Sequence, residues 1–362
     1  MTENNDNHLK LFACCFPVKG ASRSLICDVQ RYKTYFIPNS LYDMLLCLNE
    51  RSINSIYALY GANNEETITE YIQFLIENDL AFICPKKDLQ NFPSINVDDF
   101  DLPYDISNAI LELDDVDPVF LQTVVSQLIE VRCTAVEIRF LTQIELPQLD
   151  YVLSLFSDSI IKIINVILID NGYNLEEVKN LFFIHLRVTK IFIGSSINEA
   201  YYSNFTPGSS EIIFTNRKIH LPSCCGNFSK NDLNYNISFF AEAQKFNTCL
   251  NRKVAIDKTG NIKNCPSMSV SFGNIFDTKI STVIQKSDFV EKWLINKDQI
   301  EICRDCEFRY NCMDCRAYLE DPSNNYSKPL KCGYSPYTNV WEEWSVNPLK
   351  NVAKTHYNLE NI

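Results

Sequence analysis

Seven cysteines in the C-terminal part of the chain have the residue type and spacing of metal ligands. They are Cys249, Cys265, Cys303, Cys306, Cys312, Cys315 and Cys332. Two residues separate Cys303 from Cys306, and two separate Cys312 from Cys315. This gap lets two thiolates point toward one metal ion or one face of a cluster, and more distant cysteines can complete the set. The spacing therefore predicts two metal sites, and by itself it suits zinc and iron–sulfur clusters equally.

The elements around the first two cysteines are predicted to form a hairpin. Gly260 lies in the segment 257–261, which has the composition of a tight turn and requires a residue that tolerates positive φ. Cys265 would then follow on the returning strand, close to Cys249. This hairpin would bring together two cysteines that are far apart in the sequence.

The cysteine pattern resembles that of the SPASM domain, the iron–sulfur extension of many radical SAM enzymes that modify peptides. The chain departs from the family's pattern in one gap, because two residues rather than three separate Cys312 from Cys315. The resemblance implies two auxiliary [4Fe–4S] clusters. One would be held by Cys303, Cys306, Cys312 and Cys332, and the other by Cys249, Cys265 and Cys315.

The second of these clusters lacks a fourth ligand in the pattern. We consider Cys225, in the sequence Ser-Cys-Cys-Gly at 223–226, as the candidate, and a plain buried cysteine is the alternative. Four thiolates also suit Zn²⁺, so zinc remains the alternative occupant of both sites. The family resemblance favours iron.

Length and composition narrow the class of protein. The chain has 362 residues, enough for two or three domains, and its net charge of −12 argues against a nucleic-acid binder. The N-terminus has no secretory signal, and the longest apolar stretch, 160–169, is interrupted by polar residues and is too short to span a membrane. We therefore expect a cytoplasmic protein whose fifteen cysteines stay reduced and favour metal binding over disulfides.

The first block, residues 8–85, is predicted to fold as β-strands, three short helices and a closing strand, the order of a winged-helix domain. This order resembles the RiPP recognition element, which binds the leader of a ribosomally made precursor by adding it as a strand to a sheet edge. The resemblance implies a peptide-binding edge at Tyr32, Tyr35 and Ile37. A winged helix that serves dimerisation or DNA binding is the alternative.

The remaining two blocks complete an α/β fold. Residues 104–222 alternate predicted strands and helices, a pattern that favours a parallel sheet or a partial (β/α) barrel. Residues 223–350 form the cysteine-rich block, with a helix expected at 282–296. Radical SAM enzymes have a partial barrel before the SPASM domain, so the order of blocks agrees with that resemblance.

The motif that radical SAM chemistry requires is missing. No CxxxCxxC sequence occurs in the chain, and the loop after the first barrel strand reads Asp114-Asp115-Val116-Asp117-Pro118. Carboxylates cannot replace three soft thiolates, so we expect a degenerate barrel that neither binds S-adenosylmethionine nor performs radical chemistry. The three aspartates are interpreted as a solvated acidic turn rather than a Mg²⁺ site.

The segments around the cysteines narrow the resemblance. The sequences at 247–253, 261–268, 306–316 and 331–334 look like the SPASM-domain peptide maturases of grasp-with-spasm systems, which also lack the radical SAM motif. This resemblance implies a precursor peptide and an ATP-grasp ligase as partners in making a graspetide. Two alternatives remain open: an iron–sulfur redox enzyme that acts on a peptide, and a zinc-binding interaction module.

Overall fold

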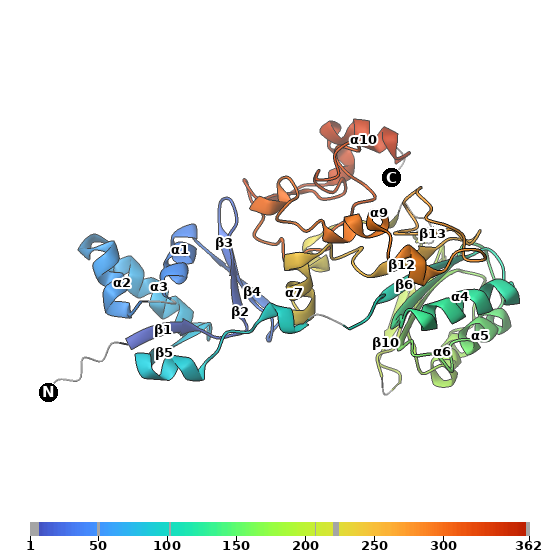
Figure 1. Cartoon of the computed structure of the whole chain (residues 1–362), viewed down its shortest axis with the longest axis horizontal. Coiled ribbons are helices and arrows are strands. Elements are labelled where there is room, and N and C mark those ends of the chain that lie inside the picture. The colour runs from blue at the N-terminus through green and yellow to red at the C-terminus, as the bar shows by residue number, and fades with distance from the viewer. Residues whose placement is uncertain (1–6, 49–50, 101–102, 207, 220–223, 360–362) are drawn as a thin grey trace.

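The computed structural model describes residues 7–48, 51–100, 103–206, 208–219 and 224–359. Figure 1 shows an elongated molecule with the N-terminal block at one end and a large sheet at the other, and with the cysteine-rich segment bridging them. Short 3-10 helices connect several elements: Ala62–Asn64, Lys86–Asn91, Val97–Phe100, Lys230–Asp232, Glu291–Leu294, Cys303–Asp305, Trp344–Val346 and Pro348–Lys350.

The N-terminal block contains two small antiparallel sheets and three helices. Its elements are β1 (Asn7–Leu11), β2 (Cys15–Val18), β3 (Ser24–Asp28), β4 (Lys33–Ile37), α1 (Asn39–Leu48), α2 (Ile53–Tyr60), α3 (Glu65–Glu77) and β5 (Ala81–Pro85). Strands β2, β3 and β4 pair in that order, and β1 pairs with β5. The expected order of strands and helices is confirmed, and the assignment as a winged helix stays a prediction.

The core of the N-terminal block extends into the cysteine-rich segment. Helix α1 buries four apolar side chains at helical spacing, and all five residues of β3 are buried. Phe240, Phe308 and Tyr334, which come from the C-terminal part of the chain, belong to the same apolar cluster. The N-terminal block is therefore packed firmly against the segment that carries the cysteines.

The large sheet has eight strands in the order β10-β11-β9-β8-β7-β6-β12-β13. Strands β11 to β12 of this order are parallel, and β10 and β13 are antiparallel edges. The elements are β6 (Asn108–Leu113), α4 (Pro118–Glu130), β7 (Ala135–Phe140), α5 (Leu146–Ser154), β8 (Ile163–Ile169), α6 (Leu175–Ile184), β9 (Val188–Gly194), β10 (Ala200–Ser203), β11 (Glu211–Phe214), β12 (Lys253–Ile256) and β13 (Ile262–Lys263). The predicted parallel α/β sheet is confirmed, the partial (β/α) barrel stays a prediction, and the expected hairpin β12–β13 extends the sheet.

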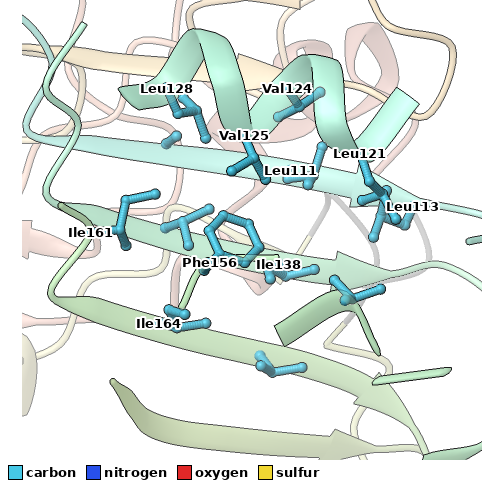
Figure 2. Close-up of a cluster of buried hydrophobic side chains, with 14 of the residues drawn as sticks. Leu111, Leu113, Leu121, Val124, Val125, Leu128, Ile138, Phe156, Ile161 and Ile164 are labelled. Atoms are coloured by element: carbon cyan, nitrogen blue, oxygen red, sulfur yellow. The ribbon is translucent and has the colours of Figure 1, made fainter. Parts of the chain in front are cut away.

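The two faces of this sheet differ in polarity. Alternate side chains such as Leu111, Ile138 and Ile164 point to one face and belong to one apolar cluster with side chains of α4, as Figure 2 shows. The opposite face carries Glu112 and Arg139, which are both buried and lie directly opposite each other on β6 and β7. Burying a polar face is costly unless its groups are paired, and here Arg139 pairs with Glu137 at 2.6 Å while the cysteine-rich segment lies across the face.

The cysteine-rich segment has little regular structure. Its elements are α7 (Ile237–Lys245), α8 (Ile280–Val283), α9 (Ser287–Val290), β14 (Tyr334–Ser335), β15 (Val340–Trp341) and α10 (Asn351–His356). The helix expected at 282–296 is wrong, because the segment divides into α8, α9 and a 3-10 turn. Ser287 and Asp288 favour the first turn of a helix over its interior, which explains the new start at α9. Among the described residues, no helix has the length and apolar character needed to cross a membrane.

Candidate metal centres

Four cysteines from distant parts of the sequence line one cavity of about 310 Å³. This sheet-side group consists of Cys225, Cys249, Cys265 and Cys315. The cavity lies between the polar face of the large sheet, where it contacts β6, β7 and β8, and the cysteine-rich segment. The structure therefore places Cys225, the candidate fourth ligand, beside the three cysteines that the SPASM-like pattern groups together.

A buried asparagine holds the sheet-side cysteines in relation to one another. Asn247 is fully buried, and its Oδ1 accepts hydrogen bonds from the backbone N–H groups of Cys249 (3.0 Å) and Leu250 (2.9 Å). Its Nδ2 donates to the carboxylate of Asp314, the residue before Cys315. Because one side chain connects both loops, it fixes the turn that carries Cys249 against the turn that carries Cys315.

Two glycines permit the close approach that this group requires. Gly260 has φ +86° in the predicted β12–β13 turn, which confirms the expected positive φ. Gly226, next to Cys225, has φ +78°, and a Cβ there would lie 3.0 Å from the Sγ of Cys315. Any side chain at Gly226 would therefore be strained and would crowd the thiol.

Two cations lie against sulfurs of the sheet-side group. Arg139 Nη2 is 3.5 Å from the Sγ of Cys225, and Lys253 Nζ is 3.5 Å from the Sγ of Cys249. Arg139 is 5% exposed, its Nε donates to Glu137 at 2.6 Å, and its Nη1 has no hydrogen-bond partner among the residues that the structure describes. Burial lowers the pKa of this guanidinium, but Glu137 and Cys225 raise it and prevail. An unpartnered cationic donor beside buried thiols fits a site that accepts a negatively charged thiolate-ligated group.

The second set of thiols lies in the irregular loops of the cysteine-rich segment. This loop group consists of Cys303, Cys306, Cys312 and Cys332. Lys297, which is 5% exposed, lies with its Nζ 3.5 Å from the Sγ of Cys312. Burial raises the pKa of Cys312 to about 11, while Lys297 opposes the shift and Cys332 adds to it. The same neighbours act on Cys303, so these thiols share one electrostatic environment.

The spacing of the sulfurs can be compared with that around a single bound ion. Four thiolates around one Zn²⁺ at about 2.3 Å would lie about 3.8 Å from each other. Within the described parts of the chain, no three ligand atoms from these eight cysteines lie within 4.8 Å of one another. Thiolates that bind different irons of one cluster lie farther apart than those that share an ion. Among the described residues, therefore, no three sulfurs of either group are as close together as they would be around one bound Zn²⁺.

The loop group is also where the N-terminal block docks. Arg23, in the turn between β2 and β3, donates from Nε to the Oε1 of Glu307 at 2.8 Å, and the Glu307 side chain is fully buried. Glu307 follows Cys306 directly in the sequence. Gly20 in the same turn has no room for a Cβ, which would lie 2.9 Å from the Cβ of Glu307. The β2–β3 turn thus packs against the loop that carries two of the cysteines.

The predicted peptide-binding residues lie on or beside β4. Tyr32 is 65% exposed in the turn before the strand, Tyr35 is half-buried, and Ile37 is 2% exposed in the core. Among the described strands, β4 pairs only with β3, so one of its edges is unpaired. Ile37 can therefore contribute its backbone to an added strand, but its side chain points into the core.

The sequence did not reveal the cations beside the cysteines, Arg139, Lys253 and Lys297, but it did predict the acidic turn after β6. Charged residues alternate with apolar ones along β7, and this signal in a strand of a parallel sheet could have identified Arg139. In the turn after β6, Asp117 caps α4 by accepting the N–H of Val119 at 2.8 Å, and Asp114 pairs with Lys258 at 2.7 Å. These two contacts agree with the interpretation as an acidic turn.

Comparison with protein families matches one segment of the chain to a known domain. Residues 248–307 match the family model of SPASM, an iron–sulfur cluster-binding domain. The matched segment contains Cys249, Cys265, Cys303 and Cys306. No curated protein matches the chain.

Three crystal structures of SuiB from Streptococcus suis are similar to this chain over most of its length. SuiB bound to S-adenosylmethionine is 10% identical, with 89% of this chain and 98% of that chain covered and a TM-score of 0.39. SuiB alone is 9% identical, with 88% and 98% covered and a TM-score of 0.40. SuiB bound to the precursor peptide SuiA is 8% identical, with 88% and 98% covered and a TM-score of 0.35. TM-scores of this size do not establish a common fold.

Proposed function

We propose that this chain is a peptide maturation protein that carries two [4Fe–4S] clusters and performs no radical SAM chemistry. In this proposal it binds a ribosomally synthesised precursor peptide and assists its modification by a partner ATP-grasp ligase. The observation that carries the proposal is the gathering of eight cysteines into two groups of four, each with a cation 3.5 Å from a sulfur. The ligase as partner rests on the grasp-with-spasm resemblance of the cysteine-rich segment.

The proposed ligands follow these two groups. Cys225, Cys249, Cys265 and Cys315 would hold the cluster that faces the sheet. The loop group, Cys303, Cys306, Cys312 and Cys332, would hold the other. Burial and neighbouring thiolates raise the pKa of Cys265 to about 11 and that of Cys315 to about 12, so cluster assembly must displace their protons. Once bound, the clusters would supply electron storage and cross-link a segment that has little regular structure.

The edge of β4 supports peptide binding by strand addition. The three-stranded sheet has two edges, β2 and β4. Strand β2 contains Pro17, which cannot donate a hydrogen bond and discourages pairing at that edge. Strand β4 contains no proline, and the exposed Tyr32 lies at its start. Backbone pairing would give affinity, and side chains of β4 would give specificity.

Metal and sulfide analysis of anaerobically purified protein tests the clusters. We expect about eight irons and eight sulfides per chain, with a broad absorption band near about 400 nm. Two zinc ions without sulfide would overturn the cluster assignment and leave a zinc-supported peptide-binding protein.

A binding assay tests the peptide edge. A fluorescently labelled precursor peptide of grasp-with-spasm type from the same genome would be titrated with the full chain, and anisotropy would report binding. We expect Tyr32→Ala and Tyr35→Ala each to weaken binding several-fold. The matched control is Tyr201→Ala, since Tyr201 is 61% exposed on β10, an edge of the other sheet. Equal loss in all three variants, or no binding by the parent protein, would refute the proposal.

A pull-down with the ATP-grasp ligase tests the partner. We expect the ligase to be retained by the chain when the precursor peptide is present. Failure to retain it, with clusters intact and peptide bound, would remove the ligase from the proposal while leaving the peptide-binding role.

One observation favours a redox enzyme as a second candidate function. The sheet-side group opens onto a cavity, and a cluster with an open iron there could bind substrate. A Cys225→Ala variant separates the two readings. Unchanged iron content would show that Cys225 is not a ligand and that the sheet-side cluster has an open iron. Loss of about half of the iron would support a fully ligated cluster.

A further inference from the structure

A third set of ligand atoms lies in the N-terminal block, away from both cysteine groups. We propose that Cys14, Cys15 and Asp28 form a zinc site. One ligand atom from each of the three residues lies within 4.8 Å of the others. It is the one such set that the described residues contain. This site is independent of the proposed clusters and of the peptide-binding role.

The local backbone brings the two neighbouring thiols to the same side. Successive residues of a continuous strand point to opposite faces. Cys14, however, lies in the turn that precedes β2, and Cys15 is the first residue of β2. Asp28 ends β3 and is the register partner of Cys15. The turn therefore places two sulfurs next to the carboxylate of Asp28, which lies 13 positions after Cys15 in the chain.

The carboxylate is fixed in place before any metal binds. Asp28 Oδ1 accepts hydrogen bonds from the backbone N–H groups of Gln30 (3.1 Å) and Arg31 (2.9 Å). Its Oδ2 accepts from Nη1 of Arg31 at 2.7 Å. A metal-binding carboxylate is commonly oriented by such surrounding donors. Oδ1 already accepts two of these hydrogen bonds, whereas Oδ2 accepts one and keeps a further lone pair that can bind a cation.

Burial and charge favour a divalent cation at this place. Cys14, Cys15 and Asp28 are 8%, 4% and 0% exposed. Two thiolates and one carboxylate carry a charge of −3, and Zn²⁺ together with the guanidinium of Arg31 supplies +3. The bound site is therefore neutral, which a buried site requires. Thiolates and a carboxylate in one tetrahedral set are ligands that Zn²⁺ accepts, and three protein ligands leave one position for water.

The spacing argues for one ion rather than a cluster. Among the described residues, no three ligand atoms of the sheet-side or loop group lie within 4.8 Å of one another, whereas these three do. A zinc ion here would tie the β1–β2 turn to the end of β3. Arg31 also donates to the carbonyl of Asp79 at 3.2 Å, so the same network reaches the turn between α3 and β5. The ion would thus join the two small sheets of the N-terminal block.

Metal analysis of the full chain tests the site. The protein is purified without oxygen, supplied with Zn²⁺, freed of loosely bound metal on a chelating resin and measured for zinc and iron. We expect about one zinc per chain in addition to the iron. A Cys14→Ser/Cys15→Ser variant should lose the zinc and keep the iron. The matched control is Cys84→Ser, because Cys84 is also buried in the N-terminal block and lies outside the site. Equal zinc loss in the control, or zinc that stays in the double variant, overturns the proposal.

X-ray absorption at the zinc edge on the unaltered protein gives a test that needs no variant. We expect two sulfur ligands at about 2.3 Å and two oxygen ligands at about 2.0 Å. Four sulfur ligands would show that zinc occupies the sheet-side or loop group, and absence of zinc would show that the trio is unliganded. Either result overturns the proposal. Iron and sulfide content reports separately on the clusters, so failure of one assignment is distinguishable from failure of the other.

Discussion

The two cysteine groups of the C-terminal segment have different neighbours. The sheet-side group lines a cavity and faces the polar side of the large sheet, where Arg139 and Lys253 approach its sulfurs. The loop group has Lys297 beside it and carries, on the residue after Cys306, the carboxylate that receives Arg23 from the N-terminal block. One group thus borders an interior space, and the other supports a contact between blocks.

This difference indicates that equal sets of four thiols can have unequal roles. A centre that borders a cavity is in a position to meet a ligand or exchange electrons. A centre that fixes loops beneath a docked block contributes mainly to the geometry of that contact. The N-terminal block, whose β4 edge pairs with no other described strand, would then depend on the loop group for its orientation and be independent of the sheet-side group.

The largest expected effect follows from removing one cysteine of the loop group, and it separates the role of this group from that of the sheet-side group. Cys312→Ser should remove about half of the iron and release the β2–β3 turn, because the loop that holds Glu307 loses its cross-link. Hydrogen–deuterium exchange of residues 19–23 measures this release, since the N–H of Ala21 donates to the carbonyl of Asp305 at 2.8 Å. Cys225→Ser serves as the matched variant and should leave the exchange of residues 19–23 unchanged. Similar exchange in both variants would mean that the two groups support docking equally.

The next effect concerns the docking contact itself. Glu307→Ala should lower the free energy of unfolding by about 2 kcal/mol, because it leaves the part-buried Arg23 and the hydroxyl of Tyr334 without their buried acceptor. Chemical denaturation monitored by fluorescence measures the change. The control is Lys19→Ala, which breaks the exposed pair of Lys19 and Asp43 in the same region and should have little effect. A small effect of both variants would show that the contact adds little to stability.

Much of the fold could be predicted because local patterns determine it. Hydrophobic periodicity predicted the alternation of strands and helices in residues 104–222, which β6 to β9 and α4 to α6 form. The spacing of the cysteines and the single glycine between Cys249 and Cys265 located the β12–β13 hairpin. These features depend on residues close together in the chain, so one sequence contains enough information.

The missing parts depend on contacts across long separations. Arg23 and Glu307 are 284 positions apart, and Arg139 and Cys225 are 86 apart, so no local pattern connects them. The 282–296 segment looked helical by composition, yet its apolar residues Val283 and Phe289 bury against the large sheet's core as separate short helices. Tertiary packing decided these cases and overrode local preference.

The cations offer a sharper comparison of the two centres. Arg139→Met removes a donor to the sulfur of Cys225 and should lower the reduction potential of the sheet-side centre alone. Lys297→Met should do the same for the loop centre, because charge and hydrogen bonds to sulfur set the potential of a cluster. Loss of one such hydrogen bond corresponds to a shift on the order of 60 mV. Redox titration followed by electron paramagnetic resonance measures both. If each variant shifts both centres equally, the cations do not act locally.

The smallest expected effect tests the uncompensated charge beside the sheet-side group. Burial raises the pKa of Glu112, and Arg139 partly opposes the shift. The Oε1 of Glu112 has no hydrogen-bond partner within the described residues. Because the folded-state pKa is raised, the stabilising contribution belongs to the protonated form and is lost as pH rises through that pKa. Glu112→Gln stays neutral and should gain about 1 kcal/mol or less at pH 8, with the gain shrinking as the pH falls. Glu130→Gln is the control and should lose stability at pH 8 rather than gain it, because Ser281 and Lys279 lower the pKa of Glu130. Urea denaturation across this pH range measures both variants. A loss of stability in Glu112→Gln at pH 8 would instead show that the attraction between the Glu112 carboxylate and Arg139 outweighs the cost of burial. The charges on the polar face of the sheet would then be balanced without a metal centre.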